Sequence, residues 1–319
     1  MAKAIVAVAI AETPRTITIK QENDMRQVRP YIPGLVKGLR SLGLALGPDY
    51  QIVYRERPVD QLNAAGTFSV DNPAYPVDNP TDPIIFCMST TVVGAAHDFT
   101  RTMPNPTPIV GVVSNPGREG FTRVRHICGV SARRSQTAGE CFLRFLETVP
   151  TLRTVHVLHK PNYPPSDEAI QLIDRVKPQG ITVVKVGFQT YADLVAAFPR
   201  LPTRDQNNAA EEGILVLAVD VALGAAVEII DTARAKKLPS FFPITDWVSK
   251  AVPSALGGYG VSQTECGRLM AERVDYIWTH NNNTPPKRWR TAPSIEWLAS
   301  ATAATELKIT LPDIVPVAE

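Results

Sequence analysis

Two kinds of segment alternate along most of the chain. Short runs of consecutive apolar residues recur, and each is followed by a stretch with apolar residues three or four positions apart. The first pattern is typical of a strand buried on both faces, and the second is typical of an amphipathic helix. The runs predict strands at 5–11, 51–54, 83–88, 108–114, 154–160, 181–188, 213–220 and 240–244. The wider spacing predicts helices at 33–44, 92–102, 135–147, 166–176, 191–198, 225–237 and 262–279.

The alternation stops and restarts near the middle of the chain, which predicts two domains. A length of 319 residues agrees with two domains of roughly 150 residues each. Strands that are apolar throughout and alternate with helices predict an α/β fold with two doubly wound parallel-sheet lobes. Because a long helix follows the last strand of the second series, we expect it to return to the first lobe. The expected domains are 1–127 with 251–285 (lobe 1), 128–250 (lobe 2), and a C-terminal extension, 286–319, packing across the lobes.

Glycine and proline interrupt this pattern at several places. Gly43 is predicted to end the first helix in the left-handed conformation, and Gly47 with the two residues after it to turn the chain into the next strand. The run 70–83 repeats VDNP and cannot hold a long helix. The GGYG stretch at 257–260 has too few glycines, at the wrong spacing, for a nucleotide-binding loop, so we expect a backbone turn there. The final 35 or so residues are polar with little periodicity.

Composition excludes some classes of partner. Hydrophobic residues make up 44% and charged residues 20% of the chain, and the formal net charge is +2. Such a balance gives no reason to expect nucleic acid or an anionic membrane surface as a partner, and no apolar run approaches the roughly 18 residues of a membrane span. The apolar run Ala4 to Ala11 is followed by charged Glu12, which favours a first strand over a secretory leader. The protein is then either cytoplasmic, or it is exported with a leader that this sequence lacks.

Polar residues that follow the predicted strands are the candidate site. In open α/β sheets, ligands bind beyond the carboxyl ends of the strands. Hydroxyls at the start of a helix cap it, and the same free N–H groups can hold a carboxylate or a phosphate. Each acidic residue in this set, taken alone, is explained by a simple cap or turn, but the shared position at strand ends favours one cleft. The candidates are Glu12, Ser89, Thr90, Thr91, Ser114, Asn115, Asp220, Thr245, Asp246 and Trp247.

Cysteine and histidine give no pattern of a catalytic or metal site. The four cysteines lie among apolar neighbours without a C-x-x-C pair, so we expect buried thiols, with one disulfide left open. His156 and His159 are three apart on a predicted strand, face opposite sides, and cannot share a metal. The basic run at 123–134 is interpreted as a solvated or domain-crossing segment. We therefore expect no metal and no cofactor.

The order of several segments resembles a known family of binding proteins. GLRSLGLALGPDYQIVYR (38–55), PTDPIIFCMSTT (80–91), TPIVGVVSNP (107–116), HICGVS (126–131), ILVLAVDVALGAAVEII (214–230) and the segment 238–277 follow one another as in this family. Together they resemble the tryptophan- and tyrosine-type substrate-binding proteins of ABC transporters. The match covers roughly residues 1–290. Two segments depart from the family's pattern: the Pro-rich run, and the sequence Arg125-His126-Ile127-Cys128 before Gly129. A ligand other than an aromatic amino acid is therefore compatible with this sequence.

This resemblance implies a type I periplasmic-binding-protein fold, with two lobes joined by a multi-strand hinge and closing on a small molecule. It implies an amino acid or a related carboxylate as ligand, and an ABC permease as partner if the protein is exported. The hydroxyls of 89–91 would hold a carboxylate, while Asp220 and Asp246 would accept from an ammonium. Ser114 and Asn115 would line the floor, and Tyr31, Trp247 or Tyr259 would stack on an apolar part of the ligand.

Two other functions remain open at this point. One is a cytoplasmic ligand-sensing domain of the same fold. The other is an isomerase or racemase that uses Cys87 and Cys128 as paired thiols, although neither has an evident activating base.

Overall fold

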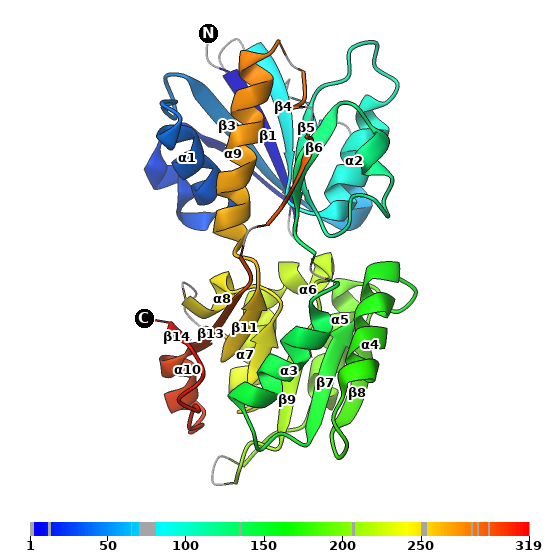
Figure 1. Ribbon diagram of the computed structural model, residues 1–319, viewed down its shortest axis with the longest axis vertical. Coiled ribbons are helices and arrows are strands. Elements are labelled where there is room, and N and C mark those ends of the chain that lie inside the picture. Colours follow the sequence, from blue (N-terminus) through cyan, green and yellow to red (C-terminus); the bar gives the residue numbers. More distant parts are fainter. Residues whose placement is uncertain are drawn as a thin grey trace. The chain divides into compact units, whose positions relative to one another are not determined.

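The computed structural model describes residues 3–11, 14–64, 66–69, 81–133, 135–205, 208–249, 254–281, 283–285, 287–292 and 294–318. The chain divides into two compact units (Figure 1). Unit 1 comprises Met1–Arg133 and Gln263–Pro293, and unit 2 comprises Arg134–Ser262 and Ser294–Glu319. The chain therefore passes three times from one unit to the other.

The sheet of unit 1 has seven strands in the order β12-β6-β5-β4-β1-β3-β2. All neighbours are parallel except β2, which pairs antiparallel with β3. The order places a switch point between β1 and β4, because the chain leaves β1 toward β3 and then returns to β1's other side. The strands are β1 (Lys3–Ile10), β2 (Arg15–Ile19), β3 (Tyr50–Arg57), β4 (Thr81–Cys87), β5 (Ile109–Val113), β6 (Ile127–Ser131) and β12 (Trp289–Thr291).

The sheet of unit 2 also has seven strands, in the order β14-β13-β11-β10-β9-β7-β8. Its central strands are parallel, while β13 runs antiparallel to β11, and the switch point lies between β7 and β9. The strands are β7 (Thr154–His159), β8 (Thr182–Gly187), β9 (Glu212–Val216), β10 (Ser240–Phe242), β11 (Gly257–Gly260), β13 (Glu296–Ser300) and β14 (Val317–Ala318).

Helices cover both faces of each sheet (Figure 1). In unit 1 they are α1 (Tyr31–Ser41), α2 (Thr90–Thr100) and α9 (Gln263–Thr279), with short 3-10 helices η1 (Glu22–Gln27), η2 (Val59–Gln61) and η3 (Phe121–Arg123). In unit 2 they are α3 (Ala138–Thr148), α4 (Pro164–Val176), α5 (Tyr191–Ala197), α6 (Asp220–Gly224), α7 (Ala226–Ala235), α8 (Asp246–Ser249) and α10 (Ala301–Glu306), with η4 (Phe198–Arg200).

Helix α1 shows how the sequence pattern produces one of these layers. Its apolar residues at 32, 35, 36 and 39 are spaced for one face, and all are buried. Gly34 allows α9 to approach closely, because a Cβ atom there would lie 1.9 Å from the Thr264 carbonyl oxygen. Gly43 follows the helix with φ of +86°, as expected for a left-handed end.

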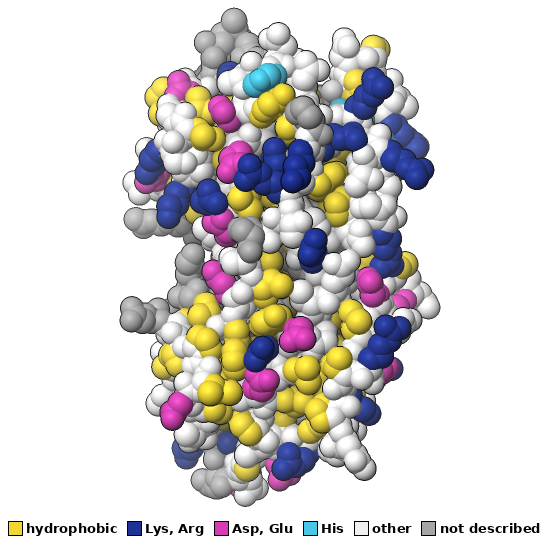
Figure 2. All heavy atoms as spheres, viewed as in Figure 1, with side chains coloured by type: hydrophobic (Ala, Val, Ile, Leu, Met, Phe, Trp, Pro, Cys, Tyr) yellow, Lys and Arg dark blue, Asp and Glu magenta, His cyan; other side chains and the backbone are white. Residues whose placement is uncertain are grey.

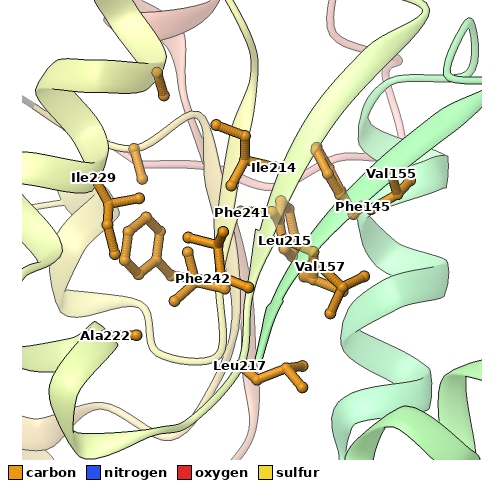
Figure 3. Packing of buried hydrophobic residues seen from close by; sticks show 14 of the residues in the cluster. Phe145, Val155, Val157, Ile214, Leu215, Leu217, Ala222, Ile229, Phe241 and Phe242 are labelled. Carbon is orange, nitrogen blue, oxygen red and sulfur yellow. The ribbon is translucent and has the colours of Figure 1, made fainter. Parts of the chain in front are cut away.

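The core of unit 2 is a continuous set of side chains between its sheet and helices. Figure 3 shows Phe145 of α3 on one side of the strands and Ile229 of α7 on the other. The rings of Phe145 and Phe241 stack with centroids 5.1 Å apart. Both aromatic rings are fully buried, and burial of that kind stabilises the folded unit by about 2–3 kcal/mol per side chain.

The structure confirms two doubly wound α/β units and corrects several local predictions. The sheets are mixed, because β2 and β13 add antiparallel strands. The GGYG stretch is strand β11 and not a turn, so 240–244 is not the last strand of its half. Glycine is needed there because a Cβ atom on Gly257 would lie 2.4 Å from the Phe241 ring, a packing requirement that hydropathy does not reveal. The polar C-terminal segment contains β12, β13, α10 and β14.

The unit boundaries lie later in the chain than the expected domain boundaries. Strand β6 pairs with β5 in unit 1, which moves the first boundary from 127 to 133. Strand β11 pairs with β10 in unit 2, which moves the next boundary from 250 to 262. Residues after 286 are divided, because β12 pairs with β6 in unit 1 and β13 with β11 in unit 2. The run 70–80 lies outside the described residues.

Candidate functional site

The carboxyl ends of β4, β5 and β6 in unit 1 carry hydroxyl side chains that form hydrogen bonds with nearby backbone groups. Ser89 caps α2 and is buried, with its hydroxyl accepting from the Val92 N–H at 3.3 Å. The Ser114 N–H donates to the Thr90 hydroxyl at 3.2 Å, and the Ser131 hydroxyl donates to the Ser114 carbonyl at 3.2 Å. The three adjacent strand ends are therefore joined by hydrogen bonds beside the switch point of the sheet.

The predicted residues of unit 1 are partly brought together. Thr90 and Ser114 are in contact, as predicted by the strand-end rule, that is, by the expectation that residues after parallel strands gather at one edge of the sheet. The Asn115 side chain accepts from the Arg118 N–H at 3.1 Å and so stabilises the following turn. Tyr31 is only 2% exposed at the start of α1, so it packs inside the unit. Glu12 lies outside the described residues.

A charged network at the carboxyl end of β3 is missing from the sequence predictions. Glu56 is 8% exposed and accepts from the Tyr54 hydroxyl at 2.7 Å. It pairs with Arg15 at 2.8 Å and with Arg29 at 3.7 Å, and Arg29 also donates to the Ile10 carbonyl at the end of β1. Burial, followed by the Glu56 carboxylate, raises the pKa of Tyr54 well above its usual range. The polar end of β3 (Tyr-Arg-Glu-Arg) was the available signal, because four polar residues rarely end a buried strand unless they are paired.

Unit 2 carries acidic side chains at its own carboxyl edge. Asp220 does not end a strand, because β9 stops at Val216, and it is instead the first residue of α6. Asp246 follows β10, is 4% exposed, and accepts from the Ser262 hydroxyl at 3.2 Å. Thr245 donates to Glu296 at 2.8 Å. Carboxylates thus follow two neighbouring strands of this unit.

Aromatic candidates in unit 2 differ in their surroundings. Trp247 follows Asp246 in α8, and its partly buried side chain packs against the core of unit 2. Tyr259 lies on β11 beneath α3, where burial, followed by the charge of Glu140, raises the pKa of its hydroxyl. Tyr259 therefore packs against a helix of its own unit, which favours a structural role over ligand stacking.

Small side chains surround a small cavity at the switch point of unit 2. Its lining includes Ser135, Ser166 and Leu217 near the starts of α3 and α4 and the end of β9. The Ser166 hydroxyl accepts from the Lys160 N–H at 3.0 Å. Both serines stand at predicted helix starts, which was the signal that could have added them to the candidate site.

The thiols are confirmed as buried and free. Cys87, Cys128, Cys141 and Cys266 are all buried and form no disulfide. Burial raises the pKa of Cys128 and of Cys141 to about 12, and raises that of Cys87 further. Because the thiolate is the nucleophile, these environments suppress thiol chemistry.

Within the part of the chain that the structure describes, no helix combines the length and apolar character that crossing a membrane requires. Across the same residues, no three His, Cys, Asp or Glu side chains are grouped as a metal site would require.

Comparison with known proteins gives structural matches only. No model of a known protein family matches the sequence, and no curated protein matches it. A conserved domain protein from Vibrio cholerae matches with a TM-score of 0.70 and 18% identity, over 100% of this chain and 99% of that one. A Streptococcus pneumoniae ABC domain in complex with L-Trp matches with a TM-score of 0.65 and 12% identity, over 98% and 96%. A Clostridium difficile substrate binding protein with adhesive properties, in an open ligand-free state, matches with a TM-score of 0.55 and 17% identity, over 100% and 99%.

These matches extend over essentially the whole chain, while the sequence identities are too low to carry more than the fold. Together with the two doubly wound units and their sheet orders, they establish that the chain has the type I periplasmic-binding-protein fold.

Proposed function

We propose that this protein is a solute-binding protein that takes a small zwitterion or carboxylate, with an amino acid as the first candidate. In each unit, residues at the carboxyl edge of the sheet are the proposed ligand contacts. The resemblance in sequence order and the fold support this class of function.

The observation that carries the proposal is the start of α2. This eleven-residue helix begins directly beside the switch point of its sheet, with Ser89 as its cap and Thr90 as its first residue. Backbone N–H groups at a helix start attract an anionic group. Both hydroxyl oxygens already accept a backbone N–H, so their O–H groups are the ones that remain to donate to a ligand carboxylate.

The acidic residues of unit 2 supply the opposite polarity. Asp220 and Asp246 would accept from a ligand ammonium, and a charge-assisted hydrogen bond of this kind is stronger than a neutral one. Asp246 is buried, so its charge requires partners, of which Ser262 supplies one. The L-Trp complex of the Streptococcus pneumoniae protein adds support for an amino acid.

The same geometry weakens the thiol-enzyme alternative. Cys87 and Cys128 are buried, and burial raises the pKa of both thiols. We therefore favour binding over catalysis. If the protein is exported, an ABC permease would be its partner in the periplasm or its equivalent, and otherwise it would sense a solute in the cytoplasm.

A thermal-shift screen of amino acids and small carboxylates, followed by calorimetry on the hits, tests the proposal. We expect at least one amino acid to raise the melting temperature at millimolar concentration, because ligand binding to the folded state stabilises it. Asp220→Asn should weaken that ligand at least tenfold, and Thr90→Val should do the same.

Matched controls separate binding from general damage. Asp231→Asn changes an exposed carboxylate on α7, and Thr102→Val an exposed hydroxyl just beyond α2. Both controls should leave the affinity unchanged. The amino-acid proposal fails if no compound in the screen stabilises the protein, or if the controls weaken binding as much as the site variants.

A further inference from the structure

A polar depression of about 810 Å³ lies at the amino edge of the unit 1 sheet, away from the strand ends discussed above. Its lining residues precede β5, β6 and β12 or follow α9. Because these strands are parallel, their amino ends share the edge opposite to Ser89 and Ser114. The volume is within the range of small-molecule pockets, roughly 300–1,000 Å³.

The lining is rich in hydrogen-bond donors and carries positive charge. It consists of Asn105, Pro106, Arg125, His126, Asn281, Asn283, Thr284, Pro285 and Arg288. Two guanidinium groups and one imidazole are present, and no Asp or Glu belongs to the described lining. The Arg125 side chain is exposed, and among the described residues it forms no ion pair. A wall of this composition favours an anion over a cation or an apolar ligand.

Hydrogen bonds between distant segments hold this lining in place. Arg288 donates to the Val124 carbonyl at 2.6 Å and to the Thr122 carbonyl at 2.5 Å. The Thr284 hydroxyl donates to the Arg125 carbonyl, and the Ile109 N–H donates to the His126 carbonyl at 2.8 Å. A guanidinium has five N–H groups, so these two bonds leave Arg288 further donors. The walls are therefore preformed by the fold, which lowers the cost of ordering them around a ligand.

His126 has a polar neighbour on α2 in this wall. Its Nε2 lies 3.1 Å from the Thr100 hydroxyl, which is also 2.9 Å from the Ala96 carbonyl oxygen. The His97 ring lies 5.5 Å from the His126 ring, centroid to centroid. Burial, followed by His97, lowers the pKa of His126. An oxyanion nearby would oppose both effects by favouring the imidazolium.

We propose that this depression is a second binding site of unit 1, for a small polar molecule that bears an oxyanion, either a phosphate or a carboxylate. Arg125 and Arg288 would engage the oxyanion, and the three asparagine amides would hydrogen-bond the polar remainder. The site is independent of the proposed solute site, because it uses none of the same residues. On the face drawn in Figure 2, Lys and Arg side chains gather over unit 1, which favours the approach of an anion.

Calorimetry and thermal shift with four probes test the site, at constant ionic strength maintained with sodium chloride. The probes are inorganic phosphate, glucose 6-phosphate, succinate and glucose. We expect at least one oxyanion probe to bind and glucose alone to give no signal. Glucose 6-phosphate exceeding inorganic phosphate would assign a phosphorylated molecule, and succinate exceeding both would assign a carboxylate.

Variants assign any binding to this depression. Arg125→Gln should weaken the bound probe at least tenfold, whereas Arg123→Gln, a neighbouring exposed arginine outside the lining, should leave it unchanged. Asn105→Asp, which adds a carboxylate to an exposed lining position, should weaken it as well. The His126 pKa, followed by NMR, should rise when the probe binds, with His97, Arg125 and Arg288 as the charged or titratable groups around it.

The solute ligand from the first screen should bind Arg125→Gln as it binds the unmodified protein, which keeps the two proposals separable. The second site is overturned if no oxyanion probe binds above the chloride background. It is also overturned if Arg123→Gln and Arg125→Gln weaken binding equally, or if binding leaves the His126 pKa unchanged.

Discussion

The two units repeat one strand order but place opposite chemistry at equivalent positions. In each, five parallel strands follow the order of a doubly wound sheet, β6-β5-β4-β1-β3 in unit 1 and β11-β10-β9-β7-β8 in unit 2. The third strand of each series leads to a helix start beside the switch point. In unit 1 that start carries Ser89 and Thr90, and in unit 2 it carries Asp220. The shared topology therefore fixes where polar groups collect, and the local sequence decides their sign.

The outer strands of the two units also differ. In unit 1, β3 is buried over almost its whole length because β2 covers its edge. Its Arg55 is fully buried and donates to the carbonyls of Gly66, Thr67 and Ser69, and burial lowers its pKa to about 10. In unit 2, the equivalent β8 is mostly exposed, and Lys185 on it pairs with Asp174 in solvent. At this strand, unit 1 therefore holds a buried charge through backbone carbonyls, whereas unit 2 holds an exposed ion pair.

The largest expected difference between the units is the stability lost when a helix glycine is replaced by alanine. Gly34→Ala in α1 places a Cβ atom 1.9 Å from a backbone oxygen of α9, whereas Gly139→Ala in α3 meets its neighbours at 3.5 Å, an ordinary contact. We expect Gly34→Ala to lower the free energy of unfolding by about 3 kcal/mol or more. Gly139→Ala should change it by less than about 1 kcal/mol. Urea denaturation of both variants measures this, and equal losses would show that α1 and α9 adjust freely.

The equivalent helix starts should respond differently to the charge of a ligand. Once the screen identifies an amino acid, an analogue that lacks its ammonium should bind the unmodified protein more weakly than the amino acid does. Asp220→Asn should bind the two compounds equally. In the same way, Thr90→Val should not distinguish the amino acid from an analogue that lacks its carboxylate, whereas the unmodified protein should. Each loss should be at least tenfold, about 1.4 kcal/mol. Calorimetry with both ligands on both proteins measures the coupling between each side chain and the ligand group that it binds. If the loss from the variant and the loss from the analogue simply add, the side chain does not bind that group, and the proposed roles of Asp220 and Thr90 are wrong.

Helix caps in the two units should contribute similar stability but differ in their effect on binding. Ser89 caps α2 at 3.3 Å, and Thr190 caps α5 at 3.2 Å together with Asp193. Replacement of either residue by Ala should cost about 0.5–2 kcal/mol of stability. Only Ser89→Ala should also weaken the solute, because α5 begins after β8, away from the switch point of its sheet. If Thr190→Ala weakens solute binding as much as Ser89→Ala does, the position of a cap beside the switch point does not explain its effect on binding.

The sequence predicted those parts of the fold that rest on local patterns. Continuous apolar runs located β1, β4, β5, β7 and β9, and the strand-end rule placed Thr90 beside Ser114. Strands in which glycine lets two backbones approach closely have no continuous apolar run to predict them. Gly129 of β6 faces the Gly111 backbone, where a Cβ atom would lie 1.8 Å from the carbonyl oxygen, so this strand carries a glycine that reduces its apolar pattern.

The charged network around Glu56 escaped prediction for a related reason. Its partners Arg15 and Arg29 belong to β2 and to the segment before α1, and they meet Glu56 only when the sheet forms. A single sequence gives no register between such segments. The four polar residues that end β3 indicate that buried partners exist, but they do not identify those partners.

The smallest expected effect is a pH dependence that differs between the units. Burial lowers the pKa of both His126 in unit 1 and His159 in unit 2. Next to burial, His97 lowers the pKa of His126 further, whereas Asp167 partly offsets the shift at His159 and Lys185 adds to it. A depressed histidine pKa means that the unfolded chain binds more protons, so stability is fully present above the unfolded value of about 6.5 and is lost as pH falls below it. His126→Gln should therefore flatten the decline in urea midpoint between pH 7 and pH 5, and His159→Gln should flatten it less. Because both rings are only partly buried, solvent screening keeps these differences modest, and a steeper decline in either variant would contradict the assigned direction.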